Sequence, residues 1–357
     1  MDSRRQEHLW KPETVRSTIS DVARRAGVST ATVSRVMNRS GRVHPATAER
    51  VRSAVQALGY TPHLAARRLM QQRTNAIGLI SAEIGGPYYA ALLRGIEEVT
   101  ARERCALLIL SISSLNYEDM DMALPLGEHN TDGLLIFTNS LPDDIVTRLH
   151  LRGHPMVMLH RTPPSGVAIP HIHVANQSGA YAAVSHLLVA HERRRIVLLR
   201  GPDGNEDAFE REQGYHRAHF DCGVEVAPEL LVQGDFSEEV AQASITELLR
   251  RGVVFDAIFA ADDESAYGAV AALRAAGRRL PEDVAIVGFD DVPLSRHLTP
   301  ALTTVAAPIQ AIGRLATELL LDQIQQGTPE RLEERKLVLE TQLVVRRSCG
   351  CTASSSE

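Results

Sequence analysis

The feature that most constrains the fold is a regular alternation, from residue 76 onward, of short apolar runs with amphipathic helical patterns. The runs at residues 77–80, 106–110, 133–137 and 257–260 are almost continuously apolar, which is typical of parallel strands buried on both faces. About nine such runs are many for one small sheet. The sequence therefore predicts an α/β core of two lobes with parallel sheets and a cleft between them, with the Pro- and Gly-rich loop 161–171 as a crossing point.

Charge is distributed unevenly along the chain. Residues 1–76 carry 14 Lys and Arg against 5 Asp and Glu, whereas the remaining residues carry 24 against 39. A small basic segment joined to an acidic body is the pattern of a module that meets a polyanion, although basic segments also occur as ordinary solvated surface. The motifs within the basic segment have to decide between these two interpretations.

Two short helices are predicted in the basic segment. Thr18 and Asp21 have the spacing of a capping box, and Gly27 ends the first helix after about two turns. Ser29 is placed to cap a second helix, which Asn38 closes. Two short helices joined by a turn that contains glycine form a helix-turn-helix.

The second helix has two different faces. Val33, Val36 and Met37 have the spacing of a buried stripe, and the opposite face is small, polar and cationic, with Thr30, Ala31, Ser34 and Arg35. Such a face suits the major groove of DNA, where arginine binds guanine, threonine a base or phosphate, and alanine a thymine methyl. The alternative is a helical hairpin with a solvated face. A third amphipathic helix at residues 45–58, which lets three helices bury a core, favours the DNA-binding interpretation.

Residues 63–70 consist of helix formers in a segment too short to be helical alone in water. We therefore expect a helix that forms only with a partner. Residues 71–75 have the composition of a linker to the acidic body.

Residues 18–38, 48–51, 59–62 and 65–69 together resemble the DNA-binding headpiece of the lactose-repressor (LacI) family of bacterial regulators. The resemblance implies base contacts and a hinge helix with Leu69 as an apolar wedge in the minor groove. The residues implied to read base edges are Thr30, Ala31 and Arg35, and those implied to contact phosphates are Thr18, Ser29, Thr32, Ser34 and Asn38. His44 stands at a further phosphate-contacting position, where a short capping residue is usual.

The same resemblance continues to about residue 348, where the body is similar to periplasmic sugar-binding proteins. Ligands of such folds bind outside the carboxyl ends of the strands. The candidates that follow predicted strands are Tyr88, Tyr89, His160, Asn205, Arg211, Phe236, Asp262 and Asp290. The resemblance implies that Arg211 and Asp290 hold a small effector while Tyr89 and Phe236 pack on it, a set of groups that complements a sugar.

Three positions depart from the family pattern. His160 replaces a frequent Asp, and Ala175 precedes Asn176 where Asp is usual. Asn205 stands where purine-responsive members carry an Arg, which disfavours a purine effector.

These patterns predict five segments. Residues 1–17 are an extension, 18–62 the helix-turn-helix domain, 63–75 the hinge and linker, and 76–348 the effector-binding and dimerisation core, with a tail at 349–357. Within the core we expect one lobe at about 76–174 and 305–331, and the other at about 175–304 and 332–348.

The sequence thus predicts a transcriptional regulator, most simply a repressor, that binds a palindromic DNA operator as a homodimer under the control of a sugar-like effector. The effector is expected to act as an inducer, with a corepressor as the alternative. An enzyme or a secreted sugar-binding protein could use the same lobes, but catalytic motifs such as a Walker loop are lacking and the first residues are polar. No apolar run reaches the roughly 18 residues of a membrane helix, so we expect a cytoplasmic protein.

No cofactor or metal is expected. Cys349 and Cys351 fall in a polar terminal segment that we expect to be frayed, with metal binding or redox activity as the alternative. His171 and His173 would share one strand face, and such a histidine pair is more often structural than metal-binding.

Overall fold

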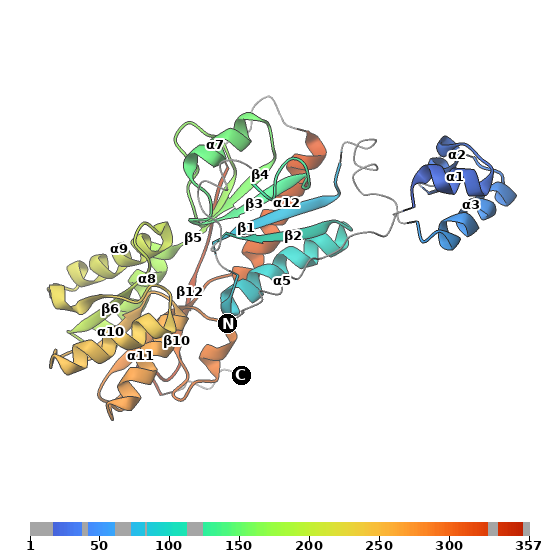
Figure 1. Ribbon diagram of the computed structural model, residues 1–357. Helices are drawn as coiled ribbons and strands as arrows, with labels where there is room; N and C mark the ends of the chain where they lie inside the picture. Colours follow the sequence, from blue (N-terminus) through green and yellow to red (C-terminus); the bar gives the residue numbers. More distant parts are fainter. Residues whose placement is uncertain are drawn as a thin grey trace, which may run out of the picture. The chain divides into compact units, whose positions relative to one another are not determined.

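The computed structural model describes residues 17–37, 42–60, 73–82, 84–112, 124–327 and 335–352 (Figure 1). These residues belong to two compact units, a headpiece up to Arg73 and a body from Thr74 onward. The expected hinge helix at 63–70, with Leu69, lies outside the described residues, as does Asn38.

The headpiece contains the three helices expected from the sequence, α1 (Ile19–Ala26), α2 (Thr30–Met37) and α3 (Pro45–Ala57). The capping box of α1 is present: the Thr18 N–H donates to Asp21 Oδ2 at 2.9 Å, and the Asp21 N–H donates to Thr18 Oγ1 at 3.3 Å. Gly27 ends α1 at a φ of 66°, a left-handed conformation that costs glycine little.

One valine from each helix holds the headpiece together. Val22, Val33 and Val51 are completely buried and pack in one cluster. Each such side chain contributes roughly 1.5–3 kcal/mol when removed from water. This core fixes which face of α2 is left to solvent.

The body contains two six-stranded sheets, as the alternation of apolar runs predicts. The first has the order β11-β5-β4-β3-β1-β2, and the second β12-β10-β9-β8-β6-β7. All pairings are parallel except that of β12 with β10. The strands of the first sheet are β1 (Ala76–Ser81), β2 (Ala106–Ser111), β3 (Gly133–Phe137), β4 (Met156–Leu159), β5 (His171–Val174) and β11 (Lys336–Leu339), and those of the second are β6 (Ile196–Arg200), β7 (Leu231–Gln233), β8 (Ala257–Ala260), β9 (Ala285–Asp290), β10 (Thr303–Ala306) and β12 (Gln342–Val344).

Helices cover the faces of both sheets (Figure 1). The first lobe carries α5 (Gly86–Arg102), α7 (Asp143–Leu151) and α12 (Ile309–Gln326), and the second carries α8 (Asn176–Ser185), the π-helix η1 (His186–Ala190), α9 (Glu206–Asp221), α10 (Glu238–Arg250) and α11 (Asp263–Ala275), with short 3₁₀ turns η2 (Pro228–Leu230) and η3 (Pro293–Arg296). Helices α5 and α12 approach each other closely at two glycines. A Cβ at Gly95 would lie 2.0 Å from the Gln310 carbonyl oxygen, and one at Gly313 would lie 2.3 Å from the Leu92 carbonyl oxygen, so only glycine permits this backbone contact.

The chain passes between the lobes three times, after β5, after β10 and after β11. The first passage is at Ala175, so loop 161–171 is not the crossing point. Strand β11 pairs with β5 in the first sheet, whereas the sequence had placed everything from residue 332 in the second lobe. Strand β10 lies in the second sheet, although the first lobe was expected to resume at residue 305.

The terminal segment is packed rather than frayed as far as Cys351. Ser348 and Cys349 are buried, at 2% and 0% exposure. The Ser348 hydroxyl donates to the Ile286 carbonyl oxygen at 2.6 Å and accepts from the Thr303 N–H at 2.8 Å. The expectation of a frayed tail is therefore wrong for residues 349–351.

Among the described residues no helix is both long and apolar enough to cross a bilayer.

Candidate functional site

The first candidate surface is the outer face of α2 in the headpiece. Ser29, Thr30, Ala31 and Arg35 are exposed, and Thr32 and Ser34 are half-buried, while Val33 is buried beneath them. The Ser29 hydroxyl accepts from the Thr32 N–H at 3.2 Å and thereby caps the helix. The exposed face is narrow, with small side chains near its N-terminal end and one cation, so a flat or grooved anionic surface can approach closely.

Thr18 and His44 flank this face at the starts of α1 and α3. The Thr18 hydroxyl donates to Asp21 Oδ2 at 2.7 Å, so its side chain is engaged in the cap as well as exposed. His44 is exposed and its side chain caps no backbone N–H of α3, which begins with Pro45 instead. The departure at residue 44 therefore leaves α3 without a side-chain cap.

The second candidate is a cleft between the two lobes of the body, with a volume of about 520 Å³. Tyr88, Tyr89 and Phe137 line it from the first lobe. The second lobe contributes residues that include Asn205, Arg211, Phe236, Asp262 and Asp290. A neighbouring hollow of about 650 Å³, lined by Arg161 and Glu206 among others, is more open to solvent. Only the smaller cleft contains Arg211, whose charge is buried, and it is therefore the stronger candidate for a ligand site.

Arg211 is the centre of a buried polar network at the base of this cleft. Its Nε donates to Asn176 Oδ1 at 2.8 Å. Its Nη2 lies 3.4 Å from Asp290 Oδ1 and 3.9 Å from Asp207 Oδ2. The guanidinium carbon lies 3.8 Å from the centroid of the Phe289 ring, which holds the group in place by a cation–π contact. One cation is thus shared between two carboxylates.

The two carboxylates that share Arg211 differ in their electrostatic environment. Burial alone would raise the pKa of Asp207, but His160 and Arg211 outweigh that effect and hold the pKa below its ordinary value. Burial raises the pKa of Asp290 to about 6, because Arg211 compensates only part of the cost and Asp262 and Asp207 add to it. Of these two carboxylates, Asp290 is therefore the one whose charge the surrounding protein compensates less.

An aromatic wall faces these charges. The ring of Tyr88 makes edge contacts with Tyr89 and Phe137, at centroid distances of 5.9 and 6.0 Å. The Tyr88 hydroxyl lies 2.7 Å from His160 Nε2. His160 Nδ1 in turn lies 2.6 Å from Asp207 Oδ2, an ion-pair distance without the alignment of a good hydrogen bond. Aromatic faces opposite hydrogen-bonding groups are the arrangement that a sugar ring requires.

The cleft brings together seven of the eight residues that the sequence proposed for it, since His160 lies behind the lining rather than in it. Asn205 and Asp262 line the cleft while also capping α9 and α11, with Asn205 Oδ1 accepting from the Ala208 N–H and Asp262 from those of Ser265 and Glu264. Burial raises the pKa of Asp262.

Comparison with known protein families identifies the chain. Residues 18–63 match the model for bacterial regulatory proteins of the lacI family, and residues 184–349 match a periplasmic binding protein-like domain. The HTH-type transcriptional regulator CelR of Thermobifida fusca is 37% identical over 93% of this chain and 98% of its own length. The chain belongs to the LacI family.

Solved structures of LacI-family regulators have the same architecture. A CelR–cellobiose complex is 34% identical, with a TM-score of 0.69 over 93% of this chain and all of its own. A lac repressor dimer bound to operator and the anti-inducer ONPF is 26% identical, with a TM-score of 0.78 over 94% of this chain and 99% of its own. The relatives are transcriptional regulators, which confirms the main functional prediction and not its alternatives.

Phe137 and Asp207 are among the cleft residues of this LacI-family chain that the sequence did not single out. Phe137 is the last residue of β3, so the rule that pointed to the ends of strands could have found it. Asp207 lies one helical turn before Arg211, where a carboxylate at this spacing can reach the arginine. Other acids near the strand ends have structural roles: Asp263 accepts hydrogen bonds from Ser295 and Thr304, and Asp291 pairs with Arg346.

Proposed function

We propose that this chain is a repressor that binds a palindromic operator as a homodimer and releases it when a neutral sugar binds the cleft. The observation that carries the DNA-binding half is the exposed face of α2, held outward by the buried Val33. The proposal places the protein in the cytoplasm with the chromosome, and it assigns no catalytic turnover to the cleft.

The proposed base contacts are those of Thr30, Ala31 and Arg35 in the major groove. Arg35 would bind the O6 and N7 atoms of a guanine, and Ala31 a thymine methyl. Ser29, Thr32 and Ser34, with Thr18, His44 and Asn38, would fix the register through phosphates. Leu69, outside the described residues, remains the proposed wedge at a central pyrimidine–purine step.

The homodimer follows from the small reach of one headpiece. A single recognition helix reads few base pairs, and a twofold pair of headpieces doubles the contacts and makes the operator palindromic. The lac repressor relative is described as a dimer bound to operator, which supports the same assembly here.

The proposed effector is a neutral sugar rather than a phosphosugar. The lining carries Arg211 as a cation against the carboxylates Asp207, Asp235, Glu239, Asp262, Glu264 and Asp290. These carboxylates accept hydrogen bonds from hydroxyls and repel a phosphate. The relative CelR was solved with cellobiose, and a cleft of about 520 Å³ is in the range of small-ligand sites.

Operator release on closure of the cleft is the proposed switch. A ligand held by Arg211 of the second lobe and Tyr89 of the first favours the closed body, and a change between the lobes can move the linkers to the headpieces. We propose that the effector is an inducer. A hinge helix that is only marginally stable alone needs its partners to form, so a change between the lobes can easily unfold it and release the operator.

The test is operator binding followed by fluorescence anisotropy, with sugars, phosphosugars and nucleosides screened for release. We expect release by a neutral sugar, loss of that response in Asp290→Ala, and unchanged operator affinity of that variant without effector. A variant that kept the full response would show that the effector binds elsewhere. Loss of operator binding in Asp290→Ala without effector would show that the body had been damaged.

A further inference from the structure

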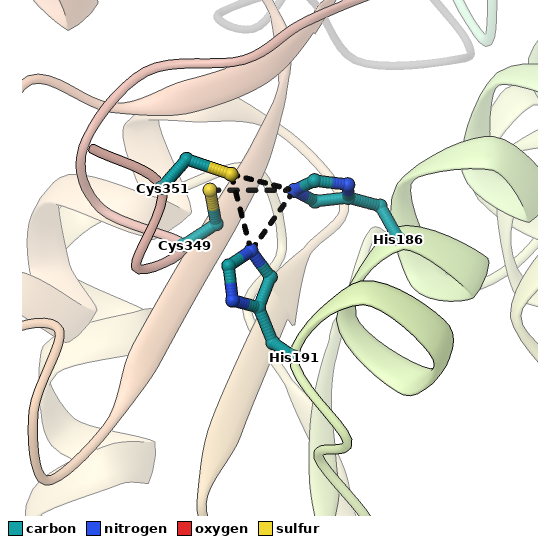
Figure 2. Close-up of side chains that lie close together, drawn as sticks. All are labelled: His186, His191, Cys349 and Cys351. Atoms are coloured by element: carbon teal, nitrogen blue, oxygen red, sulfur yellow. Dashed lines mark hydrogen bonds between the residues drawn. The ribbon is translucent and has the colours of Figure 1, made fainter. Parts of the chain in front are cut away.

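Two histidines and two cysteines converge in the second lobe (Figure 2), and none of the four is among the residues that line the cleft. His186 and His191 come from the π-helix η1 and the residue after it, and Cys349 and Cys351 from the segment that follows β12. One ligand-type atom from each side chain lies within 4.8 Å of every other. In the described part of the chain this is the one such group of three or more His, Cys, Asp or Glu side chains.

The π-helix explains how two histidines five residues apart meet. A π-helix is closed by hydrogen bonds between residues five apart, so residues at that spacing lie above one another. The rings of His186 and His191 are accordingly 4.8 Å apart with an interplanar angle of 78°, and their Nε2 atoms are 3.2 Å apart. Such single-turn π-bulges are uncommon and occur frequently at functional sites.

The cysteine side of the cluster is fixed by the body. Cys349 is completely buried, and the Thr303 hydroxyl donates to its sulfur at 3.2 Å. Gly350 has a φ of 107°, and a Cβ there would lie only 3.2 Å from His191 Nδ1. Glycine between the cysteines thus permits both the turn and the close approach of the histidine ring.

Hydrogen bonding alone does not account for these contacts. His186 Nε2 lies 3.4 Å from Cys349 Sγ, 3.7 Å from Cys351 Sγ and 3.2 Å from His191 Nε2. An imidazole nitrogen offers either one proton or one lone pair, so it serves one of these three partners well. His191 Nε2 likewise faces Cys351 Sγ at 3.3 Å in addition to His186. Four atoms that crowd around one point are the arrangement of ligands around an ion.

The separations fit a tetrahedral zinc ion. With Zn–N bonds of about 2.05 Å and Zn–S bonds of about 2.3 Å, tetrahedral angles place two nitrogens about 3.4 Å apart and a nitrogen and a sulfur about 3.6 Å apart. The corresponding distances are 3.2 Å between the nitrogens and 3.3, 3.4 and 3.7 Å between nitrogen and sulfur. A binuclear iron–sulfur centre would instead hold the cysteine pair and the histidine pair on different metals.

We propose that His186, His191, Cys349 and Cys351 form a closed, structural zinc site in the second lobe. Two thiolates and two imidazoles in a tetrahedron are a preferred donor set of this metal, and four protein ligands leave no position for a reacting water. The ion would join the end of the α8–η1 segment to the chain after β12, which are 163 residues apart in sequence at His186 and Cys349.

The test is the metal content of the full chain, purified under reducing conditions without a chelator and freed of any histidine tag. We expect about one zinc per chain, retained on dialysis, and less than about a tenth of that in Cys351→Ser and in His191→Asn. Matched controls are Cys222→Ser and His216→Asn, which change the same residue types elsewhere on the body and should keep the zinc.

Cobalt substitution is measured on the wild-type chain, so the misfolding of a variant cannot affect the result. We expect Co²⁺ to give the visible d–d bands of a tetrahedral site and a thiolate-to-cobalt charge-transfer band, both abolished by an equivalent of Zn²⁺. A chain that purifies without metal and gives no such spectrum would overturn the proposal. So would another metal at the same stoichiometry, or zinc retained in both ligand variants.

Discussion

Replacing Asp290 by Asn is expected to make the effector-free body more stable and to weaken the binding of the effector. Asp290 is 7% exposed, and its burial raises the pKa of its carboxyl from 3.8 to about 6. Because each unit of pKa difference corresponds to about 1.4 kcal/mol, the ionised group lowers the free energy of unfolding at pH 7 by on the order of 3 kcal/mol relative to its neutral form. Asn is neutral and nearly the same shape, so it avoids this cost.

The sign of the pH dependence follows from the raised pKa. The protonated carboxyl favours the folded state, so its contribution is fully present below pH 3.8 and is lost as pH rises through about 6. Arg211 and His160 lower the pKa of this carboxyl, and Asp262 and Asp207 raise it. Wild type should therefore lose stability relative to Asp290→Asn between about pH 4 and pH 6, and the difference should level off above that.

Calorimetric unfolding of the two proteins without effector, at several values of pH from 4 to 8, measures this difference. At pH 7 the melting temperature of the body should be higher in the variant by about 5 °C. Asp235→Asn is the matched control, because Asp235 lines the same cleft but is exposed, and it should change little. A variant body that melts at or below the wild-type temperature across the whole range would refute the reasoning.

The same substitution replaces charged hydrogen bonds to the effector by neutral ones, so Kd should rise at least about fivefold, as measured by calorimetric titration with the sugar that releases operator. Arg35→Ala should lose about 1–3 kcal/mol of discrimination at one or two base pairs; uniform losses across operator variants would make Arg35 a phosphate contact. Operator affinity should fall steeply with salt, because phosphate contacts release counterions, and a flat salt titration would contradict the proposed interface. Gly95→Ala should lower the melting temperature of the body, since its Cβ would lie 2.0 Å from the Gln310 carbonyl oxygen, whereas Gly127→Ala, which meets nothing within 4 Å, should not.

Most helices and strands of the body could be predicted because their signals are local. Helix α12 at residues 309–326 is an example, because its apolar stripe recurs at the helical period along its whole length and so predicts the helix from the sequence alone. Strands β11 and β12 could not be assigned in the same way. They are edge strands without a fully buried residue, and no local pattern indicates which of the two sheets they join.

The cleft was largely predictable because a rule of topology applies to it: strand ends of an α/β sheet gather at one edge. The histidine–cysteine cluster was not, although the Cys-Gly-Cys sequence was noticed. Residues 186 and 191 lie on different faces of an ordinary α-helix, and only the π-helix η1 brings them together. The cysteines reach them from the far end of the chain, a contact that no sequence period encodes.

The late return of β11 to the first sheet has a consequence for the order of events on the ribosome. The second lobe has five of its six strands once β10 ends at Ala306, but the first lobe still lacks α12 and β11, which end at Leu339. Helix α12 covers β3, β4 and β5, so part of an apolar face of the first sheet has no cover while β6 to β10 of the second lobe are being synthesised. Although it is begun first, the N-terminal lobe is thus completed only after five of the six strands of the second lobe have been made, and its nascent strands are the part of this chain that most needs a chaperone.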